Sequence, residues 1–192
     1  MTFTAIPDWS PQGVLPPINS QSPTSVDRSP YSISLTDLII HFSTSPERCR
    51  ILDGLLRYRE ALHGVGLIHG FQWLDGSFLE HVELLENRAP HDIDVVTFYH
   101  LPAGSNQRTL LNTAPGLFDP RQAKTTFHVD GYTLELKGTH PEVLVGQSTY
   151  WYSMWSHRRD HQWKGFLQID LAPTVDATAK ANLIIATSGG QP

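Results

Sequence analysis

Apolar residues recur at helical spacing after a short polar segment near residue 45. They share one side of a 3.6-residue period, which is typical of a helix that packs on a core: Ile51, Leu55, Tyr58 and Leu62. Ser45 followed by Pro46 favours a helix start, because Ser is a frequent N-cap and Pro suits the first turn. The pattern predicts a helix that begins after Ser45 and ends near Gly64.

Four later stretches are rich in branched and aromatic residues, which favour strands. They cover residues 70–74, 91–99, 126–136 and 166–171, and the third is either one strand or a hairpin that turns at Asp130-Gly131. Helices are predicted over residues 141–157 and from residue 173 to about 186, with a helical turn or two within 78–85. Because strands alternate with helices, we expect a layered α/β or α+β domain.

The two ends of the chain differ from its middle. Residues 1–33 contain many Pro and Ser and show neither a helical nor an alternating period, so we expect an extended N-terminal arm there. Residues 34–192 are expected to form one domain, with a frayed end at Ser188-Gly189-Gly190.

Composition narrows the functional classes. The net charge of -5 argues against a protein that coats nucleic acid, because such binding depends on many Lys and Arg side chains. Cys49 is the only cysteine, which excludes an internal disulfide and a Cys-rich zinc site. The sequence shows no secretory-signal pattern and no apolar run of membrane-spanning length, so we expect a cytoplasmic protein without a membrane partner.

Two carboxylates lie two residues apart in the predicted strand 91–99. Because alternate side chains of a strand share a face, Asp92 and Asp94 point the same way and Ile93 points away. Neighbouring carboxylates repel each other unless a cation lies near them, and Mg²⁺ and Mn²⁺ favour such oxygen ligands. The pair indicates either a metal site for phosphoryl transfer or a solvated strand end.

A Gly-Ser pair follows the predicted strand 70–74. Gly76 would let a phosphate approach the backbone, and Ser77 and the amides after it would donate hydrogen bonds to phosphate oxygens. An ordinary turn explains Gly76-Ser77 equally well when the pair is taken alone.

Together, Gly76-Ser77 after one strand and Asp92-Ile93-Asp94 on the next resemble the signature of the nucleotidyltransferase superfamily. Residues 74–80, 92–96 and 150–165 also resemble a family of uncharacterised bacterial nucleotidyltransferase-like proteins. The resemblance implies a mixed sheet flanked by helices and a third carboxylate from a neighbouring strand that completes the metal site. Asp130 is the first candidate by order along the chain and Asp170 the second, while a turn before Gly131 would also explain Asp130.

Residues 157–164 hold the one local basic cluster of the sequence. Arg158, Arg159 and Lys164 are candidates for binding a triphosphate, since Arg gives bidentate contacts and Lys a mobile charge. Cations after a helix also stabilise its C-terminus without a ligand. The nearby aromatic side chains fit a nucleobase or, more commonly, core packing: Tyr150, Trp151, Tyr152, Trp155 and Trp163.

The leading hypothesis is a Mg²⁺- or Mn²⁺-dependent nucleotidyltransferase that moves a nucleoside monophosphate from an NTP to a hydroxyl of RNA, protein, a nucleotide or a metabolite. Asp92, Asp94 and Asp130 would hold metal, and Gly76-Ser77 the phosphates. The arm or a protein partner would recognise the acceptor, as in a bacterial toxin–antitoxin or phage-defence system. The alternative is a module of the same fold that binds a nucleotide or a protein without turnover.

Overall fold

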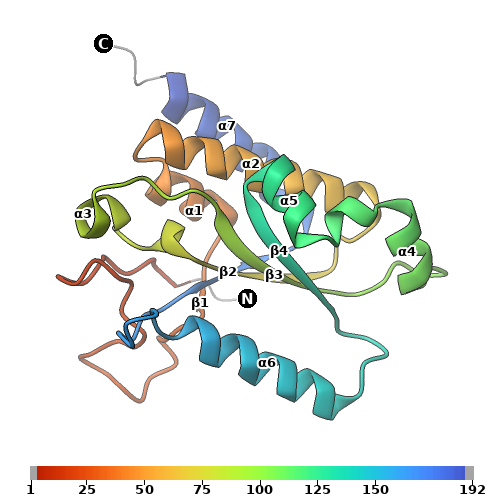
Figure 1. Cartoon of the computed structure of the whole chain (residues 1–192), viewed down its shortest axis with the longest axis horizontal. Helices are drawn as coiled ribbons and strands as arrows, with labels where there is room; N and C mark the ends of the chain where they lie inside the picture. The colour runs from red at the N-terminus through yellow and green to blue at the C-terminus, as the bar shows by residue number, and fades with distance from the viewer. Residues whose placement is uncertain (1–3, 189–192) are drawn as a thin grey trace.

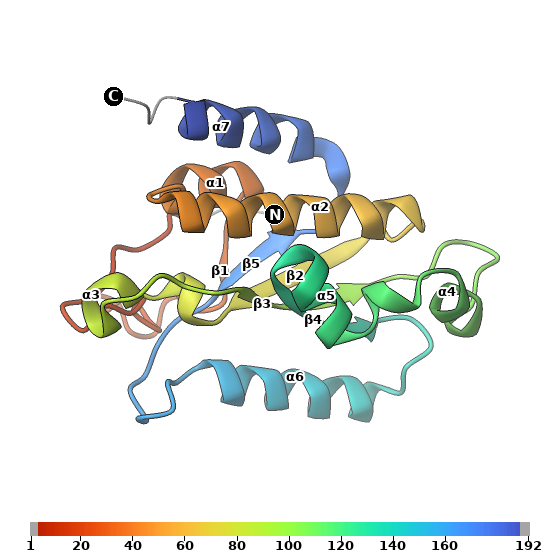
Figure 2. The same ribbon diagram turned by 45° about the horizontal axis from the view of Figure 1, so that its top comes forward.

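A five-stranded mixed sheet separates two layers of helices (Figures 1 and 2). The structure is a computed structural model that describes residues 4–188, so the expected frayed end at Gly189 and Gly190 lies outside it. The strands lie in the order β1 (Tyr31–Ser32), β5 (Leu167–Asp170), β2 (Gly70–Asp75), β3 (Ile93–Tyr99) and β4 (Val129–Glu135). Two neighbouring pairs are parallel, β1 with β5 and β3 with β4, and β2 is antiparallel to both of its neighbours.

The helices are distributed unequally over the two faces of the sheet. One face carries α1 (Leu35–Phe42) and α2 (Pro46–Gly64), on which α7 (Asp176–Ser188) packs, and α5 (Pro120–Phe127) lies against α2 and β4. The other face carries α6 (Pro141–Trp155) (Figure 2). Short helices lie toward opposite ends of the molecule, α3 (Val82–Glu86) and α4 (Gln107–Thr113). No helix within residues 4–188 combines the length and apolar composition needed to cross a membrane.

The expected layered fold and the helix after Ser45 are confirmed. The Ser45 side chain accepts a hydrogen bond from the Arg48 amide, Pro46 occupies the first turn, and the predicted apolar stripe is buried. The strands predicted over 70–74, 91–99 and 166–171 correspond to β2, β3 and β5, and the later helices to α6 and α7. Three helices, α1, α4 and α5, were not predicted.

The hairpin alternative for residues 126–136 is wrong. The strand β4 runs through Asp130-Gly131 without a turn, because each of its residues pairs with β3 in parallel register. Gly131 is needed for packing and not for a turn, because a Cβ at this position would lie only 2.9 Å from the Tyr58 hydroxyl oxygen of α2. The glycine therefore allows close contact between strand and helix.

The N-terminal arm packs on the domain along part of its length. Val14 and Leu15 are buried, and the Leu15 carbonyl accepts a hydrogen bond of 2.7 Å from the Gly165 amide. The Trp9 indole N–H donates to the Leu79 carbonyl oxygen at 2.7 Å. The arm thus contacts the segment after Gly76-Ser77 and the segment that carries Lys164.

Arg59 joins four elements in the interior. Its guanidinium is fully buried and pairs with Asp176 of α7 at 2.7 Å, while also donating to the Gln72 side chain and to the Asp170 carbonyl oxygen at 2.7 and 2.9 Å. Buried charges are costly unless they are paired in this way. Arg59 of α2 therefore fixes β2, β5 and α7.

We expect Arg59→Met to lower the free energy of unfolding by about 3–5 kcal/mol, because it leaves Asp176 and buried acceptors without their partner. Urea denaturation followed by circular dichroism measures the loss. Asp53→Asn, which removes only an exposed ion pair with Arg57 on the same helix, is the control and is expected to cost less than about 1 kcal/mol. Equal effects of the two substitutions would contradict this role of Arg59.

Candidate functional site

Strand register brings three carboxylates to one end of the sheet. Asp75, the last residue of β2, pairs with Asp94 of β3, and Asp94 pairs with Asp130 of β4. Paired residues of neighbouring strands share a face. Tyr132, two residues after Asp130, packs its ring against Trp151 of α6 at 4.8 Å, so the three carboxylates lie on the face that carries α6.

Gly76 lies directly against this cluster. It adopts φ 89°, which disfavours residues with a side chain, and a Cβ at this position would lie 2.7 Å from Asp94 Oδ2. Ser77 follows as the first residue of a 3-10 turn, Ser77–Leu79. The two motifs that the sequence singled out, Gly76-Ser77 and Asp92-Ile93-Asp94, are therefore adjacent in space.

The two candidates for the third carboxylate lie far apart. Asp130 is the register neighbour of Asp94. Asp170 pairs with Phe71, near the start of β2 and toward the end opposite to Asp75, and its carboxylate accepts a hydrogen bond from the Ala172 amide at 2.7 Å. The fold groups Asp130 with Asp94 and leaves Asp170 outside the cluster.

The negative charge of the cluster has an electrostatic consequence at Asp94. Burial, followed by the nearby charges of Asp75, Asp92 and Asp130, raises the pKa of Asp94 to about 7. Neighbouring carboxylates favour the protonated form of one of them. Burial and the neighbouring carboxylates thus both disfavour the charged form of Asp94.

A lysine of the chain already contacts two carboxylates of this site. Lys124 of α5 pairs through its Nζ with Asp92 Oδ2, and Asp130 Oδ2 lies 3.6 Å from the same nitrogen. The hydrogen bond with Asp92 is the main cause that raises the pKa of Lys124. Within residues 4–188, no three His, Cys, Asp or Glu side chains converge in a geometry that could hold a metal ion. In this arrangement the ammonium is the counter-ion of Asp92 and Asp130.

The sequence pattern singled out neither Lys124 nor Asp75 as a residue of the site. Lys124 lies in a helix that the sequence pattern did not predict, so nothing indicated which way it would point. Asp75 is buried at the end of β2. The only sequence feature that links Lys124 to the site is its spacing of six residues from Asp130. That spacing is informative only once α5 is known to lead directly into β4.

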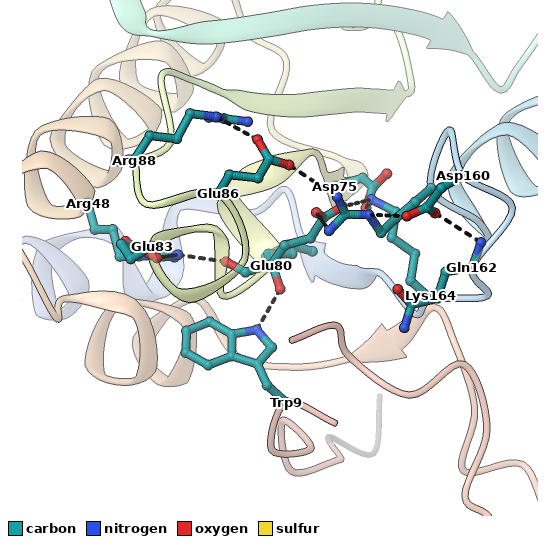
Figure 3. A network of polar contacts seen from close by, with 12 residues as sticks. Trp9, Arg48, Asp75, Glu80, Glu83, Glu86, Arg88, Asp160, Gln162 and Lys164 are labelled. Atoms are coloured by element: carbon teal, nitrogen blue, oxygen red, sulfur yellow. Dashed lines mark hydrogen bonds and ion pairs between the residues drawn. The ribbon is translucent and has the colours of Figure 1, made fainter. Parts of the chain in front are cut away.

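The basic cluster 157–164 lies beside the site, but two of its charges are paired internally. Lys164 contacts Asp75 at 2.8 Å and Glu80 at 3.1 Å, and Arg158 contacts Glu80 at 2.8 Å and Glu86 at 3.1 Å. Figure 3 shows Asp75, Glu80 and Lys164 gathered in this polar network. Arg159 is exposed in a turn. Lys164 and Arg158 thus hold the segment after Gly76-Ser77.

A second buried cation fixes the same segment from the other side. Arg48 of α2 is fully buried and donates to the carbonyl oxygens of Phe78 and Glu80 at 2.6 and 2.7 Å, and it pairs with Glu83 (Figure 3). Charge-assisted hydrogen bonds of this kind are about twice as strong as neutral ones. The turn after Gly76 is therefore held rigidly against Asp94.

The aromatic residues near the site divide between core and surface. Trp155 is buried against Phe166, and Trp151 packs on Tyr132. Tyr150 and Trp163 are exposed, Trp163 by 67%. Core packing therefore accounts for Trp155, while Tyr132 and Trp151 border the carboxylate cluster on the same face of the sheet.

Comparison with models of protein families matches residues 7–170 to a family described as "Family of unknown function (DUF6932)". Searches of the curated proteins and of the solved structures give no match. The matched range contains every candidate residue of the site, from Asp75 to Lys164.

We expect Gly76→Ala to destabilise the protein by about 1–2 kcal/mol, because the new Cβ meets Asp94 Oδ2 and φ is positive. Gly146→Ala in the middle of α6, where a Cβ meets nothing within 4 Å, is the matched control and is expected to stabilise by up to about 1 kcal/mol. Urea denaturation of both variants measures the difference. A Gly76→Ala protein as stable as the Gly146→Ala protein would contradict the close approach.

The raised pKa of Asp94 predicts a pH-dependent stability. The native state binds this proton more tightly than the unfolded chain, so the contribution is complete below about pH 4 and is lost as pH rises through about 7. With metals removed by EDTA, Asp94→Asn is therefore expected to stabilise the protein at pH 8 by about 1–3 kcal/mol and to change little at pH 4. Thermal unfolding at both pH values measures this, with Asp53→Asn as control; a pH-independent effect would refute it.

Proposed function

Because the chain belongs to the DUF6932 family, whose function is unknown, we propose its function from the geometry of this site. The protein is a metal-dependent nucleotidyltransferase that moves a nucleoside monophosphate from an NTP to an acceptor hydroxyl. The acceptor oxygen forms a bond to the α-phosphorus, the bond between the α- and β-phosphates breaks, and pyrophosphate leaves. Asp130 takes the proton of the acceptor hydroxyl.

The proposal rests mainly on one observation: features that are separate in the sequence lie next to one another in the fold. Gly76 lies against Asp94, and Asp94 is the register neighbour of Asp130, although these residues come from the turn after β2, from β3 and from β4. Each feature alone has an ordinary explanation as a turn or a strand end. Their assembly on one face, next to the turn at Gly76-Ser77, supports a site for a phosphorylated substrate.

The chemistry of the donors fits Mg²⁺ or Mn²⁺. Asp92, Asp94 and Asp130 would supply hard oxygen ligands. Mg²⁺ is commonly held by only one or two carboxylates together with substrate phosphates and water, so it does not need three side chains that already converge. A bound divalent cation would neutralise the charge that develops on the phosphates during transfer. The protein contributes the orientation of the carboxylates through the pairing of β3 with β4.

The turn after β2 would receive the phosphates. Gly76 and Ser77 allow close approach of the substrate, while Lys164 and Arg158 keep the turn in place through Asp75 and Glu80. We therefore assign Lys164 and Arg158 to positioning and retain exposed Arg159 as the member of the basic cluster that is open to an anion. Recognition of the acceptor is assigned to a partner or to the arm, in keeping with a bacterial toxin–antitoxin or phage-defence component.

A second candidate function rests on Lys124. An ammonium group that pairs with Asp92 and Asp130 neutralises part of the site without metal. The same geometry would suit a module that binds a nucleotide or a protein partner and performs no transfer. The two candidates differ in whether the Asp92 and Asp94 carboxylates are needed for a reaction.

The test incubates the purified protein with α-labelled NTPs and Mg²⁺ or Mn²⁺, and with total RNA, cell lysate or no acceptor. We expect label transfer that falls at least about 100-fold in Asp92→Asn and Asp94→Asn, because several kcal/mol of transition-state stabilisation are lost. Asp170→Asn, which alters a carboxylate outside the cluster, is the matched control and is expected to retain activity. Transfer that survives Asp94→Asn would refute the site, and NTP binding without transfer would support the second candidate.

A further inference from the structure

The position of Lys124 follows from the local structure of α5. Asp119 caps the helix by accepting a hydrogen bond of 2.9 Å from the Arg121 amide, and Pro120 occupies the first turn. Ala123 is buried, which fixes the side of the helix that faces the core. The helix ends at Phe127. His128 follows it in the left-handed backbone conformation, and β4 begins at the next residue. Lys124 is thus carried by the element that leads directly into the strand of Asp130.

The two lysines of the site differ in their exposure. The Lys164 side chain is 6% exposed and is held between two carboxylates that are themselves buried. The Lys124 side chain is 51% exposed, although it contacts two carboxylates of the same cluster. An ion pair with a solvent-exposed partner contributes little, whereas breaking a buried pair is costly. Lys164 is therefore fixed, and Lys124 is free to leave.

A hollow of about 450 Å³ lies beside Lys124 and offers its ammonium group a second position. It is lined by Asp119, Pro120, Arg121, Lys124, Asp130 and Tyr132. The four-carbon stem of lysine rotates easily, and Arg121 adds a second positive charge to the lining. An ammonium turned into this space would stand beside Arg121 and next to the carboxylates.

We propose that Lys124 is a displaceable counter-ion of the carboxylate cluster. In the free protein it holds Asp92 and Asp130, it yields them to a divalent cation, and it then turns into the hollow to bind phosphate together with Arg121. The inference rests on the proposed function, since it assigns the cation and the phosphate to the same site. It also explains how several carboxylates stay together before any ligand arrives.

The exchange is favourable because of charge. A divalent cation carries twice the charge of an ammonium and is coordinated directly by carboxylate oxygens. The positive charge of Lys124 stays close to the site, where the incoming phosphates add negative charge. Once the substrate is bound, Lys124 therefore no longer competes with the divalent cation for the carboxylates.

The test measures binding of Mn²⁺ alone to the full chain by electron paramagnetic resonance of the free ion. We expect Lys124→Gln to bind Mn²⁺ about two- to fivefold more tightly, because the competing charge is absent. Lys124→Arg is expected to bind it more weakly than the natural protein, since a guanidinium pairs bidentately with carboxylates. Lys137→Gln, an exposed lysine just beyond the far end of β4, is the matched control and is expected to change nothing.

A second measurement separates this role from a purely structural one. At saturating Mn²⁺, inorganic triphosphate is expected to bind Lys124→Gln about fivefold more weakly, as measured by calorimetry. The substitution thus affects the two ligands in opposite directions, whereas a loss of structure would weaken both. If Lys124→Gln fails to fold, as judged by circular dichroism, the test rests on Lys124→Arg, which is expected to bind Mn²⁺ more weakly than the natural protein.

The outcomes distinguish this inference from the proposed function. Mn²⁺ binding that requires Asp92 but is unchanged or weaker in Lys124→Gln would overturn the role of Lys124 and leave the metal site standing. If Lys124→Gln binds triphosphate as tightly as the natural protein, the proposed second position of Lys124 in the hollow would be overturned. Absence of Asp92-dependent Mn²⁺ binding in all variants would overturn both proposals.

Discussion

The backbone pairing of β3 with β2 on one side and β4 on the other sets the position of every candidate functional side chain. Because side chains alternate along a strand, a slip of one residue would move Asp94 to the face that packs on α2. A slip would also carry Ile93 and Val95 away from the face on which they are buried. The carboxylates thus share one face as a consequence of the register of β3 with its two neighbours.

Charge is the second constraint on the site. Four aspartates approach one another there, and burial, followed by the charges of the other three, raises the pKa of Asp94. The chain supplies two lysines from opposite directions, Lys164 from the segment before β5 and Lys124 from the helix before β4. Their different exposure separates a fixed structural cation from an exchangeable one. A site that is partly neutralised in this way can fold without a ligand and still accept one.

Three basic side chains hold the segment after Gly76 in place. Arg48, Lys164 and Arg158 all reach this segment from distant parts of the chain, and each is engaged with a carboxylate or a carbonyl oxygen there. Such contacts hold the backbone of the turn in one conformation, which favours binding of a ligand that needs fixed amide and hydroxyl groups. The rigidity of the turn and the mobility proposed for Lys124 are therefore complementary.

The sequence by itself determined the layered fold, the long helix after Ser45, most strands, and the pairing of Gly76-Ser77 with Asp92-Ile93-Asp94 as the place to search, because periodicity and turn residues act over short distances. Only the tertiary structure decided that Asp130 and not Asp170 joins Asp94, that β4 continues through Gly131, and that Lys164 is a buried structural cation. It also placed Lys124. These outcomes depend on strand register and on partners many residues away, and no local pattern encodes either.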